Sequence, residues 1–216
     1  MKFLKTDFYG DTNIGIYGFA TDKYVLLGIG PKNKEQLEKI LKAKIHVISI
    51  ASSQLIGLFC SGNKNGIIIT KLVEKNEIQK LKEILDINIE IIETEHTAQG
   101  NLILCNDNGC LISPLIEKYQ EKIEKCLNVP VKVGKIGEFD IVGSVAIANN
   151  KGCLVCNDIT DEQVKTIEDL LKVKVDVGSI NGKPFIKSGI INNSNGTLIS
   201  KDVTGPELQR IMEVFK

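Results

Sequence analysis

The histidines and cysteines are the side chains of this 216-residue chain that could act as general bases, nucleophiles or metal ligands. A catalytic centre needs a nucleophile, a base and a group that orients the base. His46 stands between Ile45 and Val47 in an alternating pattern, which indicates a strand residue that faces solvent. His96, the other histidine, lies at the junction of two repeated segments and is expected on the surface. Neither histidine is therefore predicted to be a catalytic base.

The six cysteines lie inside apolar runs, at positions 60, 105, 110, 126, 153 and 156, and their spacing forms no disulfide framework. Cys153 and Cys156 have the C-x2-C spacing of a zinc pair, but positions i and i+3 of a strand face opposite sides, and no second pair exists. Cys105 and Cys110 flank a turn, and we interpret them as reduced, cross-strand neighbours. We predict no metal site.

A glycine-containing segment ahead of a predicted helix is the remaining candidate for a cofactor site. Gly28-Ile29-Gly30-Pro31-Lys32 resembles a phosphate-binding loop, but proline has no backbone N–H to donate and the rest of the fingerprint is absent. A loop that leads from a strand to a helix explains the segment better. No cofactor is expected.

The elements that must carry these side chains recur along the chain. Each of five segments contains three apolar residues in the i, i+3, i+4 spacing of one buried helical face. The triads are Leu37/Ile40/Leu41, Leu81/Ile84/Leu85, Ile123/Cys126/Leu127, Ile167/Leu170/Leu171 and Ile211/Val214/Phe215. Their last members are spaced by 44, 42, 44 and 44 residues, which indicates an internal repeat.

An asparagine-rich turn precedes the helix of each segment except the first, which has Thr21-Asp22-Lys23 instead. These turns end at Gly66, Gly109, Gly152 and Gly196. Asparagine and glycine tolerate the positive φ that tight hairpins use. The flanking apolar runs, such as Gln54 to Cys60, lack alternation, which predicts hairpin strands covered on both faces. Each segment therefore reads as strand, turn, strand, outer helix and half-exposed strand.

The two ends of the chain fit together as parts of one unit. The fifth segment stops at Lys216, after its helix, and lacks a third strand, whereas Met1 to Phe8 precede the first hairpin. We predict that residues 1–8 supply the missing strand and close a ring, which leaves no open end. The prediction is a single α/β domain over residues 1–216, a closed propeller with five-fold pseudosymmetry and repeats of about 44 residues. An open solenoid with polar caps is the alternative.

Charge and composition limit the classes of partner. Basic and acidic residues number 27 each, so no global field attracts the chain to nucleic acid or membranes. Arg210 is the one arginine and tryptophan is absent, which argues against direct RNA recognition as the main source of affinity. Charge interrupts the amino terminus too early for a signal peptide, and no apolar run reaches the roughly eighteen residues of a membrane span. We expect a cytoplasmic protein.

Four groups of residues together carry a resemblance to a known family. They are Ile14-Gly15-Ile16 to Leu26, Ile56 to Cys60 with Gly62 to Gly66, Gly100-Asn101-Leu102 with Cys105-Asn106-Asp107, and Val142-Gly143-Ser144 with Asn149 to Leu154. In order and spacing, over essentially the whole chain, they resemble the translation initiation factor 6 family, most closely its archaeal form. The resemblance implies the pentein fold, which agrees with the predicted ring, and a protein that is not an enzyme.

The resemblance also implies a ribosome anti-association factor. Such a factor binds the large ribosomal subunit at its intersubunit face, chiefly through a large-subunit ribosomal protein, and blocks joining of the small subunit. It is also implied in late maturation of the large subunit, and we expect a monomer. By the same resemblance, the residues that face the ribosome are Leu55, Gly57, Leu58, Asn63, Gly100 and Asn101. A family position often held by arginine is Leu58 here, which weakens that contact.

Two other functions are alternatives. Some penteins are enzymes that modify guanidinium substrates with a cysteine nucleophile, a histidine and carboxylates in the central cavity. Here neither histidine forms a His-x-Asp motif, and no cysteine lies near the carboxy terminus. The second alternative is a non-ribosomal protein-interaction scaffold. Two explanations of the asparagine-rich turns remain open. Asparagine and glycine are the residues that tight turns require, or the turns form a docking surface at one end of the ring.

Overall fold

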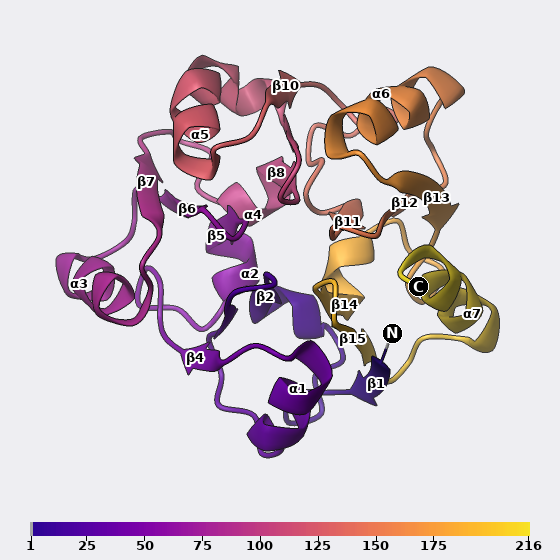
Figure 1. The fold of residues 1–216 in the computed structure, drawn as a ribbon, viewed down its shortest axis with the longest axis horizontal. Coiled ribbons are helices and arrows are strands. Elements are labelled where there is room, and N and C mark those ends of the chain that lie inside the picture. The colour runs from indigo at the N-terminus through magenta and orange to yellow at the C-terminus, as the bar shows by residue number, and fades with distance from the viewer. Residues whose placement is uncertain (1) are drawn as a thin grey trace.

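Five three-stranded sheets stand around a common axis in residues 2–216, the part of the chain that the computed structural model describes (Figure 1). In every sheet the central strand pairs antiparallel with the first strand and parallel with the third. In four sheets a helix joins the parallel pair, because parallel neighbours need a crossover connection. The protein is a mixed α/β protein of five similar units, which we number in chain order.

The strands follow the same order in each unit. The first strands are β2 (Gly18–Ala20), β5 (Cys60–Gly62), β8 (Ile103–Cys105), β11 (Ala146–Ala148) and β14 (Ile190–Asn192). The central strands are β3 (Val25–Leu27), β6 (Gly66–Thr70), β9 (Cys110–Ile112), β12 (Gly152–Cys156) and β15 (Gly196–Ser200). The third strands are β4 (Ile45–Val47), β7 (Asn88–Ile92), β10 (Val131–Val133), β13 (Lys174–Gly178) and β1 (Lys2–Thr6). Central strands are buried throughout, whereas third strands are partly exposed, as their sequence patterns indicate.

The helices lie in two places. The longer ones occupy the outer rim in Figure 1 and are α1 (Lys34–Leu41), α3 (Lys75–Ile84), α5 (Gln120–Leu127), α6 (Asp161–Leu171) and α7 (Gly205–Val214). The 3-10 helix η2 (Pro114–Tyr119) leads into α5. Short helical turns precede the first strands near the axis, and they are η1 (Ile14–Ile16), α2 (Ile56–Phe59), α4 (Gln99–Leu102) and η3 (Ile186–Gly189).

These short turns correct the predicted strand from Gln54 to Cys60. Ile56–Phe59 is helical, and the strand begins only at Cys60. A short apolar run does not distinguish a buried strand from a buried helical turn, because neither leaves a polar face. The corresponding apolar runs of the other units that have a helical turn were also expected to be strands, and the same correction applies to them.

Each hydrophobic core lies between two neighbouring units. Helix α5 of unit 3, for example, packs on β6 and β7 of unit 2. The core that contains Ile14, Val25 and Leu37 of unit 1 also contains Ile191 and Leu198 of unit 5. Burial of apolar surface therefore joins the last unit to the first, just as it joins successive units.

The predicted helix triads face these cores, with one exception. Leu81 is fully buried on α3, but Ile84 is 36% exposed at the end of that helix. The helix stops at Ile84 and the backbone turns into an extended conformation at Leu85, which is buried in its place. The prediction of a buried Ile84 was therefore wrong.

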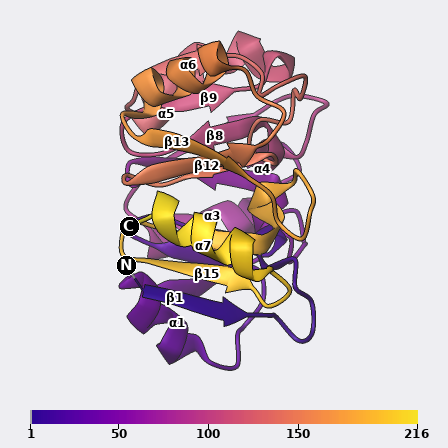
Figure 2. The ribbon, with the colours of Figure 1, turned by 90° about the vertical axis from the view of Figure 1, so that its right-hand side faces the viewer.

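Strand β1 pairs in parallel with β15, with Lys2 opposite Gly196 and Thr6 opposite Ser200. The two strands run side by side in the same direction, and both chain ends lie on the same side (Figure 2). Residues from the start of the chain thus provide the third strand of the fifth sheet, while Met1 lies outside the described residues. Within residues 2–216, no helix has the length and apolar character needed to cross a bilayer.

Candidate functional site

The short helical turns meet around one end of the axis, which we call the glycine end. At the same position of each unit's turn it has Gly15, Gly57, Gly100, Gly143 and Lys187. A Cβ atom added to Gly57 would lie 2.0 Å from the carbonyl oxygen of Gly15, and one added to Gly100 would lie 1.9 Å from that of Gly57. Glycine is therefore required at both positions, because consecutive turns approach too closely for any side chain.

Three of the predicted ribosome-facing residues line one hollow at the glycine end. Half-buried Leu58 and Asn101 line this hollow of about 240 Å³ together with Gly57, Lys183 and Phe185. The Phe185 side chain is 41% exposed there. This arrangement offers apolar area, amide groups and positive charge, and the residues that line the hollow include no aspartate or glutamate. Such a mixed surface suits a protein partner.

The other predicted residues differ in their exposure. Leu55 is half-buried at the N-cap of α2, whereas Gly100 is buried in α4, and neither lines the hollow. Asn63 is 2% exposed and lies beyond β5, in the turn at the opposite end of the axis. The structure therefore brings five of the six predicted residues to the glycine end and does not bring Asn63 there.

The opposite end, which we call the asparagine end, is built from Thr21, Asn63, Asn106, Asn149 and Asn193. Each of these asparagines donates its side-chain amide to the backbone carbonyl of the corresponding residue in the next unit. The bonds are Asn63 to Asn106 at 3.2 Å, Asn106 to Asn149 at 3.1 Å, Asn149 to Asn193 at 3.0 Å and Asn193 to Thr21 at 2.9 Å. Hydrogen bonds of these buried side chains thus connect the units in sequence.

Unit 1 has no asparagine at this position, and a tyrosine completes the circuit. The hydroxyl of Tyr24 donates to the carbonyl of Asn63 at 3.1 Å. Tyr24 is 1% exposed, and burial raises the pKa of its hydroxyl well above the ordinary value of 10.0. Nothing in the local sequence around Tyr24 signals this role, because its partner lies in another unit.

The asparagine-rich turns also differ from the sequence prediction in their backbone. Residues 62–66 do not have positive φ, although asparagine and glycine were expected there for that reason. The Asn63 side chain instead accepts hydrogen bonds from the backbone N–H groups of Asn65, at 2.9 Å, and Gly66, at 3.2 Å. A Cβ atom at Gly66 would lie 2.4 Å from the carbonyl oxygen of Cys126, at the end of the next unit's helix. The glycine permits this close helix packing.

A cavity of about 50 Å³, which we call the axial cavity, lies between the two ends. Lys187 and Asn192 line it together with small side chains such as Ala20 and Ala148. The ammonium group of Lys187 donates to the carbonyl oxygen of Gly100 at 2.7 Å. Burial lowers the pKa of Lys187 to about 8. The sequence analysis missed Lys187, although the aligned repeats place it where the other four units have glycine.

Cys105 is the thiol of the axial cavity, and it lies directly opposite Cys110 in the β8–β9 register, which confirms the predicted cross-strand pair. All six cysteines are free thiols. The residues that line the cavity include no histidine, aspartate or glutamate. His46 is half-buried in β4 and His96 is exposed, so neither accompanies Cys105. The set needed for nucleophilic catalysis is not assembled there.

Cys153 and Cys156 lie on β12, where both thiols are buried in the same hydrophobic core. Burial raises the pKa of each thiol, which disfavours the thiolate form that binds metals. Among residues 2–216, no three histidine, cysteine, aspartate or glutamate side chains are grouped so that they could hold a metal ion. The pair is part of the core.

This fold and site define a class of protein. It is an α/β protein of five repeated sheet units, with a mixed apolar and basic hollow at one axial end. The chain belongs to the eIF-6 family, whose sequence profile matches residues 3–214. The family resemblance seen in the sequence is thereby confirmed.

Curated relatives from archaea agree with this assignment. Translation initiation factor 6 of Methanocaldococcus jannaschii is 37% identical over 169 residues, which cover 75% of this chain and 74% of the relative. The protein of the same name from Thermococcus onnurineus is 37% identical over 173 residues, or 76% of each chain. That from Saccharolobus islandicus is 38% identical over 170 residues, again 76% of each chain. The chain is thus a member of a family of translation initiation factors.

Proposed function

We propose that this protein binds the large ribosomal subunit and prevents its association with the small subunit. The observation that carries the proposal is the family match over residues 3–214, together with archaeal relatives named translation initiation factor 6. In this proposal the protein acts in the cytoplasm as a monomer, and it also takes part in late maturation of the large subunit.

We propose that the glycine end contacts a large-subunit ribosomal protein at the intersubunit face. Leu58 and Asn101 offer half-buried side chains in the hollow, and Leu55 lies at the N-cap of the same helical turn as Leu58. Gly57 and Gly100 contribute by setting the backbone of the turns, because neither can carry a side chain. Asn63 acts at a distance, through the hydrogen bonds that hold the units together. Arg210 lies on the outer helix α7, paired with Asp176, so RNA contributes little at the hollow.

We infer that the whole chain forms one closed domain of the pentein type. Three features support closure between unit 5 and unit 1: the pairing of β1 with β15, the shared core around Ile14 and Leu198, and the bond from Asn193 to Thr21. A rigid ring would suit a factor that acts by occupying space, since it needs no moving catalytic parts.

The same proposal includes that the protein is not an enzyme. Enzymes of related fold that modify guanidinium groups need a cysteine beside a histidine and carboxylates. Cys105 has Lys187 and Ser61 in its cavity instead. Citrulline formation from arginine by the pure protein would contradict this part of the proposal.

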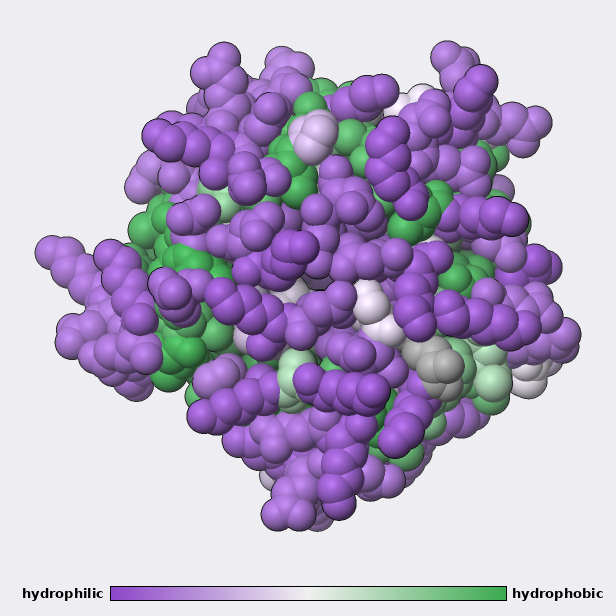
Figure 3. All heavy atoms as spheres, in the orientation of Figure 1, coloured by the Kyte–Doolittle hydropathy of each residue, from purple (hydrophilic) through white to green (hydrophobic). Residues whose placement is uncertain are grey.

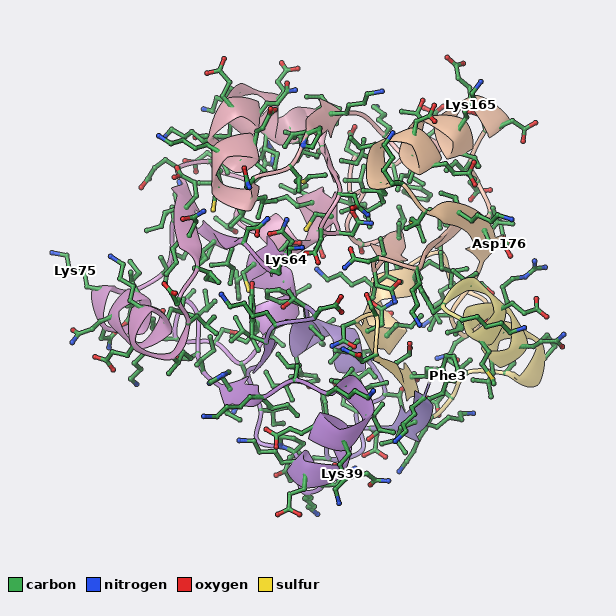
Figure 4. The ribbon with its side chains drawn as sticks, viewed as in Figure 1. Phe3, Lys39, Lys64, Lys75, Lys165 and Asp176 are labelled. Atoms are coloured by element: carbon green, nitrogen blue, oxygen red, sulfur yellow. The ribbon has the colours of Figure 1, made fainter. Side chains whose placement is uncertain are left out.

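Sedimentation of ribosomal subunits in gradients, with and without the protein, tests the proposed function. We expect the wild-type protein to cosediment with large subunits and to lower the yield of joined ribosomes. Leu58→Asp and Asn101→Lys should weaken both effects, because each places a charge in the hollow. Lys165→Asp is the matched control, since Lys165 is exposed on α6 at the outer rim (Figure 4). Unchanged subunit joining with the wild-type protein sinks the proposal and leaves the scaffold alternative.

A further variant decides between the two ends of the axis. Lys64 lies near the centre of the view from the asparagine end, where the surface is largely hydrophilic (Figures 3 and 4). Its ammonium group is 3.7 Å from a carboxylate oxygen of Asp107. If Lys64→Asp abolishes cosedimentation while Leu58→Asp leaves it intact, the ribosome contacts the asparagine end and the proposed glycine end is wrong.

A further inference from the structure

The side chain of Lys187, a half-buried residue, lines the axial cavity, and no carboxylate among the described residues neutralises its charge. Lys187 takes the position that Gly15, Gly57, Gly100 and Gly143 hold in the other units. An ammonium group has three N–H donors, and the carbonyl oxygen of Gly100 accepts one of them. No carboxylate of residues 2–216 forms an ion pair with Lys187 or lines this cavity. A partly desolvated charge is stabilised by an opposite charge or by further hydrogen bonds.

Asn192 supplies a second polar group without a partner. Its side chain is 4% exposed and lines the same cavity, and its Nδ2 donor has no hydrogen-bond acceptor. The corresponding positions of units 1 to 4 hold Ala20, Gly62, Cys105 and Ala148, so the carboxamide is particular to unit 5. Buried donors normally have an acceptor, which makes an unpaired one an indication of a missing ligand.

The remaining polar side chains of the cavity do not satisfy these donors. The Ser61 hydroxyl donates to the carbonyl oxygen of Ile103 at 3.3 Å, and the Cys105 thiol donates to that of Gly62 at 3.2 Å. The cavity therefore presents one positive charge and an unpaired amide donor among small apolar side chains. Its chemistry calls for an acceptor that carries negative charge.

Size and access restrict that acceptor further. A cavity of about 50 Å³ holds a small ion with a few water molecules, since one water molecule needs about 10–15 Å³ of cavity volume. Lys183 and Lys187 line the hollow at the glycine end, whereas Asp22 and Asp107 line the asparagine end. The charges at the glycine end thus attract anions, and those at the asparagine end repel them.

We propose that the axial cavity is a binding site for one small monovalent anion of the halide type, held by the Lys187 ammonium and the Asn192 amide. The ion would neutralise the one charged side chain at the centre of the ring. Lys187 also lines the hollow at the glycine end, but neither Lys187 nor Asn192 is among the residues proposed to contact the subunit.

Bromide in crystals of the full-length protein is the direct test, because its anomalous scattering distinguishes it from water. We expect an anomalous peak next to Lys187 Nζ in the wild-type protein and in Lys183→Met, which removes the nearby exposed lysine. The peak should disappear in Lys187→Met. A wild-type cavity that holds water without an anomalous peak overturns the proposal, as does a peak that persists in Lys187→Met.

Thermal unfolding in bromide or sulfate at equal ionic strength provides a second measurement in solution. Saturating bromide should raise the wild-type melting temperature by about 2–4 °C more than that of Lys187→Met. Lys187→Gly restores the residue of the other four units, and it replaces Lys187→Met if that variant does not fold. Asn192→Ala, which restores the alanine of units 1 and 4, should reduce the bromide response. Equal responses of the wild-type protein and both lysine variants contradict the proposed site.

Discussion

The side-chain amide of Asn193 donates to the carbonyl oxygen of Thr21, a residue 172 positions earlier in the chain, at 2.9 Å. The same amide also donates to the carbonyl of Leu41, at the end of helix α1, at 2.8 Å. One side chain of unit 5 thus satisfies two buried backbone groups of unit 1. Because these bonds connect the two ends of the sequence, their loss should affect the whole fold and not a local turn.

Replacing Asn193 by alanine should therefore destabilise the protein strongly. The change leaves two carbonyl groups without donors, at a cost of about 1–3 kcal/mol for each buried group left unpaired. Urea unfolding followed by circular dichroism measures the loss. Asn195→Ala is the control from the same turn, since the structure shows no hydrogen bond of that side chain, and it should change stability by about 0.5 kcal/mol or less. Equal losses in the two variants would contradict this role of Asn193.

Overpacking a core typically costs about 1–3 kcal/mol of stability. Replacing Gly100 by alanine should lower the free energy of unfolding by more than that. The added Cβ would lie 1.9 Å from a backbone oxygen, so the helical turns themselves must move apart. Gly205→Ala is the comparison, because nothing lies within 4 Å of the Cβ position at the start of α7. That variant should be neutral or slightly stabilising in thermal unfolding. A tolerated Gly100→Ala would show that the turns are not closely packed.

Acid should weaken the protein partly through Glu207. Partial burial acts to raise the pKa of this carboxyl, but hydrogen bonds from Gly182, Ser179 and Thr204 outweigh it and lower the pKa to about 2 from an ordinary 4.5. A lowered pKa stabilises the folded state above about pH 4.5, and this contribution is lost as the pH falls toward 2. Glu207→Gln should therefore be less stable than wild type at pH 7 and nearly equal to it at pH 2.

Unfolding free energies measured at several pH values test this expectation. Glu138→Gln, which alters an exposed carboxylate in a loop, is the control and should track the wild-type curve. A constant gap between Glu207→Gln and wild type across the whole range would rule out the proposed ionisation.

The thiol of Cys105 should be the first of the six to react with a small reagent such as methyl methanethiosulfonate. It is the half-buried cysteine and lines the axial cavity, and its hydrogen bond with Cys110 lowers its pKa. Burial raises the pKa of Cys60 to about 12 and that of Cys126 to about 11. Thiolates are the reactive form, so those cysteines should react slowly.

Mass spectrometry of the native protein during the reaction resolves the order of modification. Cys105→Ser should remove the fast adduct, whereas Cys153→Ala should retain it. A fast adduct at Cys153 in the wild-type protein would be incompatible with its complete burial in a core.

The repeat and the outer helices could be predicted because each depends on local patterning. The triad of Leu37, Ile40 and Leu41 recurs at a nearly fixed spacing, and such periodicity arises from the packing of each helix on a sheet. The turns near the axis could not be predicted in the same way. Ile56 to Phe59 form a helix because Gly57 must pass close to Gly15, a contact between different units.

The candidate site was predictable only in part for the same reason. Leu58 and Asn101 lie together at the glycine end because their units pack in the same orientation, and the repeat indicates this. Asn63 was assigned to the same surface, although the strand that follows α2 carries it to the opposite end. Lys187 shows the reverse case: its exceptional place among glycines is visible once the repeats are aligned, but its position at the axial cavity is not.

The pairing of β1 with β15 also constrains the order of events during synthesis. Lys2 is made well before its strand partner Gly196, which lies 194 residues later in the chain. Strand β1 therefore stays without this partner until β15 has been made. Native contacts between such distant residues slow folding, because a long loop must close before they form. A nascent chain that ends before β15 lacks the junction between unit 5 and unit 1, so it cannot assemble the surfaces around the axis.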